Sequence, residues 1–271
     1  MAPNPDMALF NERCMLSLVI SCSYYPANAA METATGPPAI AMLTQAGLLP
    51  SPPERTVVLD IACAAGGVAA RFFESASIGD ESEFICGDLA ENMVKAAEAR
   101  IGKHGWKAEA KVIDAHDINY PAEYFTHAFM CFGPQLMKDP ILALREMKRV
   151  LSSSGAIGFT CWTSPGWYPT MRAIIPDFPF PAAISGDWTR PEFIQSTLAD
   201  LGLTDIKVVP LDFTTEERDV EALIEIQHVL FAKIAVGEVG ERLDRHLRDE
   251  FAREGKIVWK WQALIVTAVK S

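Results

Sequence analysis

Basic charge and long hydrophobic runs are scarce in this sequence of 271 residues. Only 24 Lys and Arg residues stand against 35 Asp and Glu, which gives a formal net charge of −11. This charge repels phosphate backbones, so a nucleic-acid substrate is disfavoured. The apolar run at 14–22 is too short to span a bilayer, and no internal repeat is present. A small-molecule ligand is therefore favoured.

Cysteines occur without the spacing that binds metals. None of the six forms a C-x-x-C pair, and no histidine lies near them at zinc spacing. Four fall in or at the ends of expected core strands: Cys63, Cys86, Cys131 and Cys161. We therefore expect buried free thiols, no bound metal, and a reducing, cytoplasmic location.

A G-x-G-x-x-G motif is also missing, but one stretch joins a strand to a turn of very small residues. Residues 57–61 are apolar except for Asp60, residues 62–67 are small, and a helix-like segment follows. A strand that leads through such a turn into a helix is typical of the nucleotide-binding corner of a doubly wound α/β sheet. Small residues let the backbone approach a ligand closely.

Strands and helices alternate after residue 56, which predicts a parallel sheet. The expected strands are 56–61, 83–87, 108–113, 125–131, 156–162, 205–211 and 257–269. The expected helices are 67–76, 90–101, 140–151, 191–201, 216–236 and 240–254. Pro37 and Pro38 are expected to begin a further helix that runs to residue 46. A turn is expected at 152–155, and a long loop over a site at 163–189.

Acids close three successive expected strands: Asp60, Asp88 and Asp114. The carboxyl ends of parallel strands form the ligand crevice of an open sheet. Asp88 is placed to accept both hydroxyls of a ribose, and Asp114 to accept from an exocyclic amine. The alternative is that each acid only caps a turn, but three acids in register favour a ligand site.

The motifs around these acids resemble class I methyltransferases that depend on S-adenosylmethionine (SAM). Asp60-x-Ala62-x-Ala64-x-Gly66 is similar to their acid-x-G-x-G-x-G motif. Residues 84–93 resemble the G-x-D-x-S-x-x-M segment, 112–116 the G-D-A segment, and 142–155 the helix and turn written E-x-x-R-V-L-K-P-G-G. The similarity covers about 57–209 and is greatest to ubiquinone/menaquinone-type enzymes and their fungal secondary-metabolism relatives.

The resemblance implies a Rossmann-like α/β fold with a seven-stranded, mostly parallel sheet and an antiparallel last strand. Residues 1–55 would form an N-terminal helical cap. Residues 56–271 would form the methyltransferase domain, with lid insertions at about 163–190 and 214–254. The implied cofactor is SAM, and its expected binding residues are Tyr24, Asp60, Ala62, Ala64, Gly66, Asp88, Leu89, Met93, Asp114, Ala115 and Cys131.

Candidates for catalysis and acceptor binding are less specific. A general base helps when the acceptor is a hydroxyl or an amine, and His116 and His228 are the candidates. Loop capping by His116 and helix packing by His228 are the alternatives. Aromatic residues near the ends of two strands are expected to line an apolar acceptor pocket, unless they only pack the loop on itself: Phe132, Trp162, Trp167 and Tyr168.

The expected function is methyl transfer from SAM to an O, N or C atom of an apolar natural product, by a monomer or homodimer. Ala64 departs from the family pattern and is expected to crowd the turn that faces the methionine portion of SAM. One alternative is therefore a cyclisation or pericyclic step on the same fold, without methyl transfer. A non-catalytic partner subunit is another. A NAD-dependent dehydrogenase is disfavoured, because the sequence lacks G-x-G-x-x-G.

Overall fold

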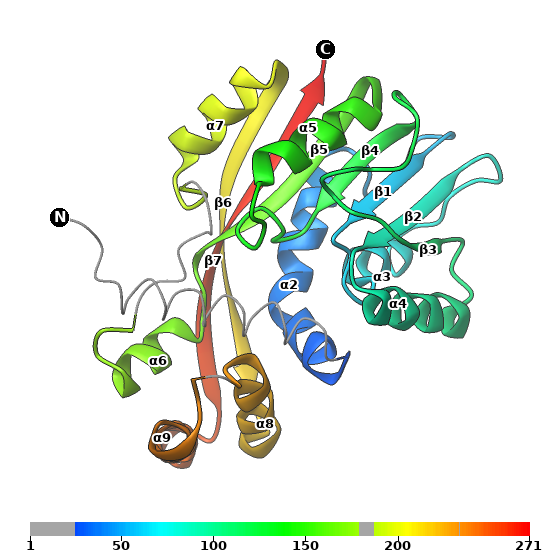
Figure 1. Ribbon diagram of the computed structural model, residues 1–271. Coiled ribbons are helices and arrows are strands. Elements are labelled where there is room, and N and C mark those ends of the chain that lie inside the picture. Colours follow the sequence, from blue (N-terminus) through cyan, green and yellow to red (C-terminus); the bar gives the residue numbers. More distant parts are fainter. Residues whose placement is uncertain (1–24, 179–186, 233) are drawn as a thin grey trace.

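The computed structural model describes residues 25–178, 187–232 and 234–271, and within them a seven-stranded sheet forms the centre (Figure 1). Its strand order is β3-β2-β1-β4-β5-β7-β6. The strands are β1 Val57–Ile61, β2 Glu83–Asp88, β3 Glu109–Val112, β4 Phe125–Met130, β5 Leu151–Ser164, β6 Leu203–Glu217 and β7 Ile257–Lys270. Strands β1 to β5 are parallel, and β7 is antiparallel to both β5 and β6. The expected α/β sheet with its antiparallel last strand is confirmed.

Helices cover both faces of the sheet. On one face lie α2 (Tyr25–Gln45), α3 (Gly67–Phe73) and α4 (Glu91–His104), and on the other lie α5 (Pro140–Val150) and α7 (Pro191–Asp200) (Figure 1). All five residues of β1 are buried, because a central parallel strand is covered on both sides. Val58 faces the α2–α3 side and Leu59 the α5–α7 side, as the alternation of a strand requires.

The β6–β7 hairpin extends beyond the carboxyl end of β5. Ser164, the last residue of β5, pairs with Gln262 of β7, whereas β6 and β7 stay paired as far as Glu217 and Ile257. Three helices pack around this extension: α6 (Tyr168–Ile174), α8 (Val220–Leu230) and α9 (Gly237–Glu254) (Figure 1). They form a second apolar core at the strand ends where the sequence places the ligand site.

The expected start of the N-terminal helix is wrong. Helix α2 runs from Tyr25 through Pro37 and Pro38 to Gln45, so the two prolines lie inside the helix. Each proline lacks a backbone N–H and so removes one helical hydrogen bond. The helix persists because Met42 and Leu43, further along it, are fully buried against the sheet. Tertiary packing outweighs local propensity here.

Three other expected boundaries also differ from the structure. Strand β5 begins at Leu151, so the expected turn at 152–155 is instead a strand irregularity with Ser154 at φ 63°. The expected loop at 163–189 contains helix α6. Strand β6 continues to Glu217, where a helix was expected from residue 216. Within the described ranges no helix is both long and apolar enough to cross a bilayer.

His127 of β4 is a buried titratable group in the core. Its Nδ1 lies 2.9 Å from the hydroxyl of Thr126, which itself bonds the backbone of Val57. Burial lowers the pKa of His127 from its ordinary value of 6.5 to about 4. The folded protein therefore holds this imidazole neutral at a pH where the unfolded chain already binds a proton.

His127→Asn is expected to flatten the loss of stability in mild acid. The pKa of His127 is lower in the folded protein than in the unfolded chain. As the pH falls from 6.5 to about 4, the unfolded chain therefore binds a proton that the folded protein does not, and the free energy of unfolding decreases. The shift corresponds to about 3 kcal/mol over that window, and the variant should lack this part of the loss. Urea unfolding of both proteins across the window measures it, and identical pH profiles would contradict the assignment.

Candidate cofactor site

The turn that follows β1 has an unusual backbone. Ala62 (φ 55°), Ala64 (φ 48°) and Gly66 (φ 76°) all lie in the left-handed region. Glycine adopts this conformation freely, whereas alanine adopts it at a cost of about 1–2 kcal/mol per residue. These are the three positions that the sequence motif assigns to glycine. The turn therefore keeps the backbone shape of the motif although two of the three residues carry a methyl group.

Hydrogen bonds from β2 hold this turn in place. The Cys63 N–H donates to the Gly87 carbonyl at 3.0 Å, and the Ala64 N–H donates to Oδ2 of Asp88 at 2.9 Å. The Gly66 N–H closes the turn on the Cys63 carbonyl at 2.9 Å. A strained backbone persists only where its surroundings determine it, and the end of β2 supplies that constraint.

Asp88 connects the turn to the start of α4. Its Oδ2 accepts from Ala64 and its Oδ1 from the N–H of Ala90 at 2.9 Å. Burial raises the pKa of Asp88, and the backbone N–H bonds from Ala90, Ala64 and Leu89 partly offset the rise. Each carboxylate oxygen has a second lone pair, so Asp88 can still accept from ligand hydroxyls. Beside it, Leu89 is exposed and Met93 is buried.

Asp60, at the end of β1, is completely buried. Neither of its carboxyl oxygens has a hydrogen-bond partner among the described residues. Burial raises the pKa of Asp60 well above its usual range, and the charge of Asp88 raises it further. A buried carboxyl without a donor is costly, so this group suits a ligand that brings a positive charge or a donor.

Asp114 follows β3, on the other side of β2 from Asp60. Its Oδ1 accepts from the backbone N–H of His116 at 2.8 Å and lies 2.9 Å from the ring Nδ1. The backbone bond from His116 is the main cause that lowers the pKa of Asp114. Asp114 thus caps its own loop, as the turn-capping alternative expects, beside the buried Ala115. The His116 Nε2 is buried and has no partner within the described part of the chain.

The residues after β4 form a second strained turn. Phe132 has φ 60°, and its N–H donates to the Thr160 hydroxyl at 2.9 Å. The same hydroxyl lies 3.4 Å from Sγ of Cys131 and donates to it. The ring of Phe132 stacks on Trp162 of β5, with 3.9 Å between ring centroids and 7° between planes. The structure therefore brings together two of the four expected acceptor-binding residues.

Sequence reasoning missed two aromatic residues that contact Trp162 and one amide that holds its backbone. Trp162 also contacts Trp261 of β7, at 5.1 Å between centroids, and Phe213 of β6, at 6.3 Å. Gln135 holds the Trp162 backbone at both ends, accepting from its N–H at 2.6 Å and donating to its carbonyl at 2.9 Å. The sequence carried the aromatic signal on the two late strands, but Gln135 has no local motif.

Trp167 and Tyr168 lie in the neighbouring apolar core. The ring of Trp167 packs on Phe231, at 4.9 Å between centroids, and it is buried among the helices α6, α8 and α9. The Tyr168 hydroxyl donates to the Phe178 carbonyl at 3.3 Å. The Tyr168 contact lies within the loop, as the alternative expects, whereas Trp167 packs on a residue that follows α8. Acceptor binding by the two residues stays a prediction.

His228 faces α9. Its Nε2 lies 2.6 Å from Oδ1 of Asp244, and the other carboxylate oxygen, Oδ2, lies 3.8 Å from Arg248. This pair joins the two helices, in line with a packing role, and among the described residues no contact places His228 beside the turn at 62–66. Tyr24, the remaining expected cofactor residue, lies outside the described residues.

One group of side chains in the described ranges could hold a metal ion. The donor atoms of Asp60, Cys63 and Cys86 all lie within 4.8 Å of one another, and all three residues are buried. The pKa of Cys63 is raised well above its usual range, first by its hydrogen bond with Cys86 and then by burial. Thiols and carboxyls must lose their protons to bind a metal, and a raised pKa opposes that loss. The expectation that no metal is bound stays a prediction.

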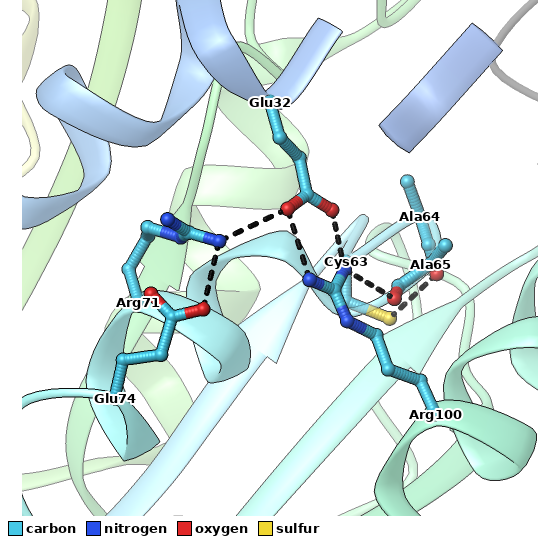
Figure 2. Close-up of polar contacts among 7 residues, drawn as sticks. All are labelled: Glu32, Cys63, Ala64, Ala65, Arg71, Glu74 and Arg100. Carbon is cyan, nitrogen blue, oxygen red and sulfur yellow. Dashed lines mark hydrogen bonds and ion pairs between the residues drawn. The ribbon is translucent and has the colours of Figure 1, made fainter. Parts of the chain in front are cut away.

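A network of ion pairs that sequence reasoning did not find joins α2 to the turn at 62–66 (Figure 2). Glu32 pairs with Arg71 of α3 and Arg100 of α4, and Arg100 also reaches the Ala65 carbonyl. These residues are 39 and 68 positions from Glu32 in the sequence, so no local pattern could have indicated the network.

Comparison with known proteins agrees with this geometry. A family model described as a methyltransferase domain matches residues 58–155. The methyltransferase tpcH of Aspergillus fumigatus is 24% identical over 254 residues, which cover 84% of this chain and 90% of that protein. The acetylaranotin bis-thiomethyltransferase of Aspergillus terreus is 26% identical over 208 residues, covering 72% and 71%.

A solved structure shows the same fold. It is a candidate methyltransferase from Bacillus halodurans, with a TM-score of 0.57 and 17% identity over 85% of this chain and 98% of that one. The chain therefore contains a methyltransferase domain at residues 58–155, and its sheet order is that of the class I methyltransferase fold, whose cofactor is SAM.

The residues present fit the cofactor. SAM carries a positively charged sulfonium and an amino-acid ammonium group, and the buried Asp60 carboxyl lacks a partner in the described chain. The ribose hydroxyls of SAM donate hydrogen bonds and need acceptors. Each carboxylate oxygen of Asp88, at the end of β2, accepts one backbone N–H and has a second lone pair for such a bond. Ala64 does not disrupt the turn, because its backbone adopts the left-handed conformation that the motif requires.

Asp88→Asn is expected to weaken SAM binding at least about tenfold, or about 1.4 kcal/mol, because it removes the charge and one acceptor oxygen. Calorimetric titration measures the affinity. Asp200→Asn, an exposed acid at the end of α7, is the matched control and should bind like the wild type. Equal affinity in the Asp88 variant would exclude Asp88 from the ribose role.

Proposed function

We propose that this methyltransferase transfers a methyl group to an O, N or C atom of an apolar natural product. The observation that supports the acceptor class best is the stack of Phe132 on Trp162. It lies at the carboxyl ends of β4 and β5, and β4 is the direct neighbour of the strand that carries the cofactor turn. Flat aromatic faces bind apolar and planar molecules well.

The conformation of Phe132 supports a functional role. A bulky residue in the left-handed region costs about 1–3 kcal/mol, and such strain concentrates at binding sites. The Thr160 hydroxyl and the Trp162 ring hold Phe132 in that state. We infer that this strain is retained because it presents the aromatic stack to the acceptor.

The names of relatives support a small-molecule acceptor. The Aspergillus terreus relative is called an acetylaranotin bis-thiomethyltransferase. That name adds sulfur to the acceptor atoms that a test should cover. The acidic balance of this chain, a net charge of −11, also fits an uncharged organic acceptor better than a nucleic acid.

In the proposed mechanism the protein positions the two reactants. SAM supplies the methyl group as an electrophile when bound. Asp88 and the turn at 62–66 hold the cofactor, and Asp60 compensates positive charge beside it. The aromatic stack holds the acceptor and excludes water, and such positioning lowers the barrier to transfer. The segments around α6 and α8–α9 are proposed to act as the lid over the acceptor.

His116 is the better of the two proposed bases. Its Nδ1 is engaged by Asp114, which leaves Nε2 as the basic nitrogen, and this nitrogen is buried. His228 commits its Nε2 to Asp244 between α8 and α9. We therefore propose that His228 stabilises the lid rather than the reaction.

Incubation with SAM and a panel of planar apolar phenols, amines, enols and thiols is expected to give a product heavier by one methyl group. Trp162→Leu should lower kcat/KM for the acceptor at least about tenfold and leave the SAM affinity unchanged. Mass spectrometry and titration calorimetry measure these effects. Tyr124→Leu, an aromatic residue just before β4 at its opposite end, is the control and should retain activity.

Other outcomes separate the alternatives. A rearranged product of unchanged mass would favour a cyclisation or pericyclic step. Turnover only after addition of a second protein would favour a partner subunit. Equal kcat/KM for the Trp162 and Tyr124 variants would remove the aromatic stack from acceptor binding.

A further inference from the structure

Helix α2 is fixed to the cofactor turn by the ion-pair network around Glu32. Oε2 of Glu32 accepts from Arg71 at 3.2 Å and from Arg100 at 2.9 Å, and Oε1 pairs with the other terminal nitrogen of Arg100. Figure 2 shows both guanidinium groups converging on this one carboxylate. The same Arg100 nitrogen that bonds Oε1 also donates to the Ala65 carbonyl, over a longer 3.5 Å.

This network is more buried than an ordinary surface ion pair. The side chains of Glu32 and Arg100 are only 15% and 13% exposed. Arg71 also pairs with Glu74, but Glu74 is 49% exposed and bonds Arg71, not Arg100 (Figure 2). A buried, two-pronged carboxylate–guanidinium pair is stronger and more directional than a solvated one.

Glu32 lies on α2 between the turn at 62–66 and the apolar core that contains α6, α8 and α9. Its carboxylate lies against the first turn of α3, 4.0 Å from where a β-carbon on Gly67 would sit. The neighbouring α2 residues Met31 and Ala34 pack in the apolar core formed by α6, α8 and α9. Glu32 is therefore placed where α2 meets both the cofactor turn and the lid core.

We propose that Glu32 is a positioning residue for SAM binding. Through Arg100 it holds the Ala65 carbonyl, and thereby keeps the turn at 62–66 in its left-handed shape. Two alanines in that turn disfavour this shape, so the turn needs a restraint beyond its bonds to β2. Glu32 supplies it from a helix outside the motif. This inference rests on SAM binding at the turn.

The test measures SAM affinity by calorimetric titration of the full chain, together with the thermal midpoint. Glu32→Gln is expected to weaken SAM binding about tenfold, because the neutral amide loses the ion pair that orients Arg100. Glu74→Gln is the matched control, since it removes a carboxylate from the same Arg71 but not from Arg100. It should leave the SAM affinity unchanged.

Arg100→Lys provides a second variant that retains the charge. A single ammonium cannot make the two-pronged bond to Glu32 and still reach the Ala65 carbonyl as the planar guanidinium does. We expect it to weaken SAM binding in the same direction as Glu32→Gln, with a thermal midpoint close to that of the wild type.

Rescue by Ala64→Gly distinguishes positioning from general stabilisation. Glycine adopts the left-handed conformation without help, so Ala64→Gly should restore more affinity in the Glu32→Gln background than it adds to the wild type. Equal gains in the two backgrounds would overturn the inference, because Glu32 would then not act through the turn.

The remaining outcomes are also decisive. If the wild type binds SAM and Glu32→Gln binds it equally well, this inference fails and the cofactor assignment stands. If the wild type does not bind SAM, both fail together.

Discussion

The left-handed backbone of the turn at 62–66 is the constraint on which the rest of the site depends. Two of its three left-handed residues are alanines, so the shape is imposed by the surrounding structure rather than adopted freely. The carboxylate of Asp88 supplies part of that constraint by accepting from Ala64, and so the residue proposed for ribose binding also holds the turn. If Asp88 binds the ribose as proposed, the same carboxylate sets both the cofactor affinity and the shape of the turn.

Helix α2 has a wider role than an N-terminal cap. It packs on α3 through its buried face, reaches the turn at 62–66 through Glu32 and Arg100, and places Ala34 in the apolar core with α6, α8 and α9. A single helix thus contacts α3, the turn at 62–66 and the second apolar core. Because Pro37 and Pro38 remove hydrogen bonds from its middle, the continuity of the helix depends on these contacts.

The sheet and the cofactor turn could be predicted from the sequence because their signals are local. Residues 57–61 are uniformly apolar around Asp60, and the small residues after them occupy every second position. The strand ends near Asp88 and Asp114 were predicted for the same reason. Where local propensity and tertiary packing disagree, the prediction was wrong. Pro37 read as a helix start, although the buried side chains beyond it keep the helix continuous.

The rest of the site could not be predicted because its contacts join distant segments. Glu32, Gln135 and Phe213 have no motif of their own. Their contacts form only when segments far apart in the sequence come together in the folded chain. Likewise, His228 looked like a helix histidine that could face an acceptor, but its partner Asp244 lies on the next helix. Hydrophobic periodicity reports which face of an element is buried, but it does not report which element covers that face.

The antiparallel pairing of β6 and β7 makes the segment that carries α8 and α9 a separable module. Glu217 and Ile257, where the segment with α8 and α9 leaves and rejoins the sheet, are paired neighbours at the tip of one ladder. A segment whose two ends lie side by side can be replaced without moving the strands beneath it. Exchanges or insertions between residues 218 and 256 are therefore expected to leave the order of the sheet and the turn at 62–66 unchanged.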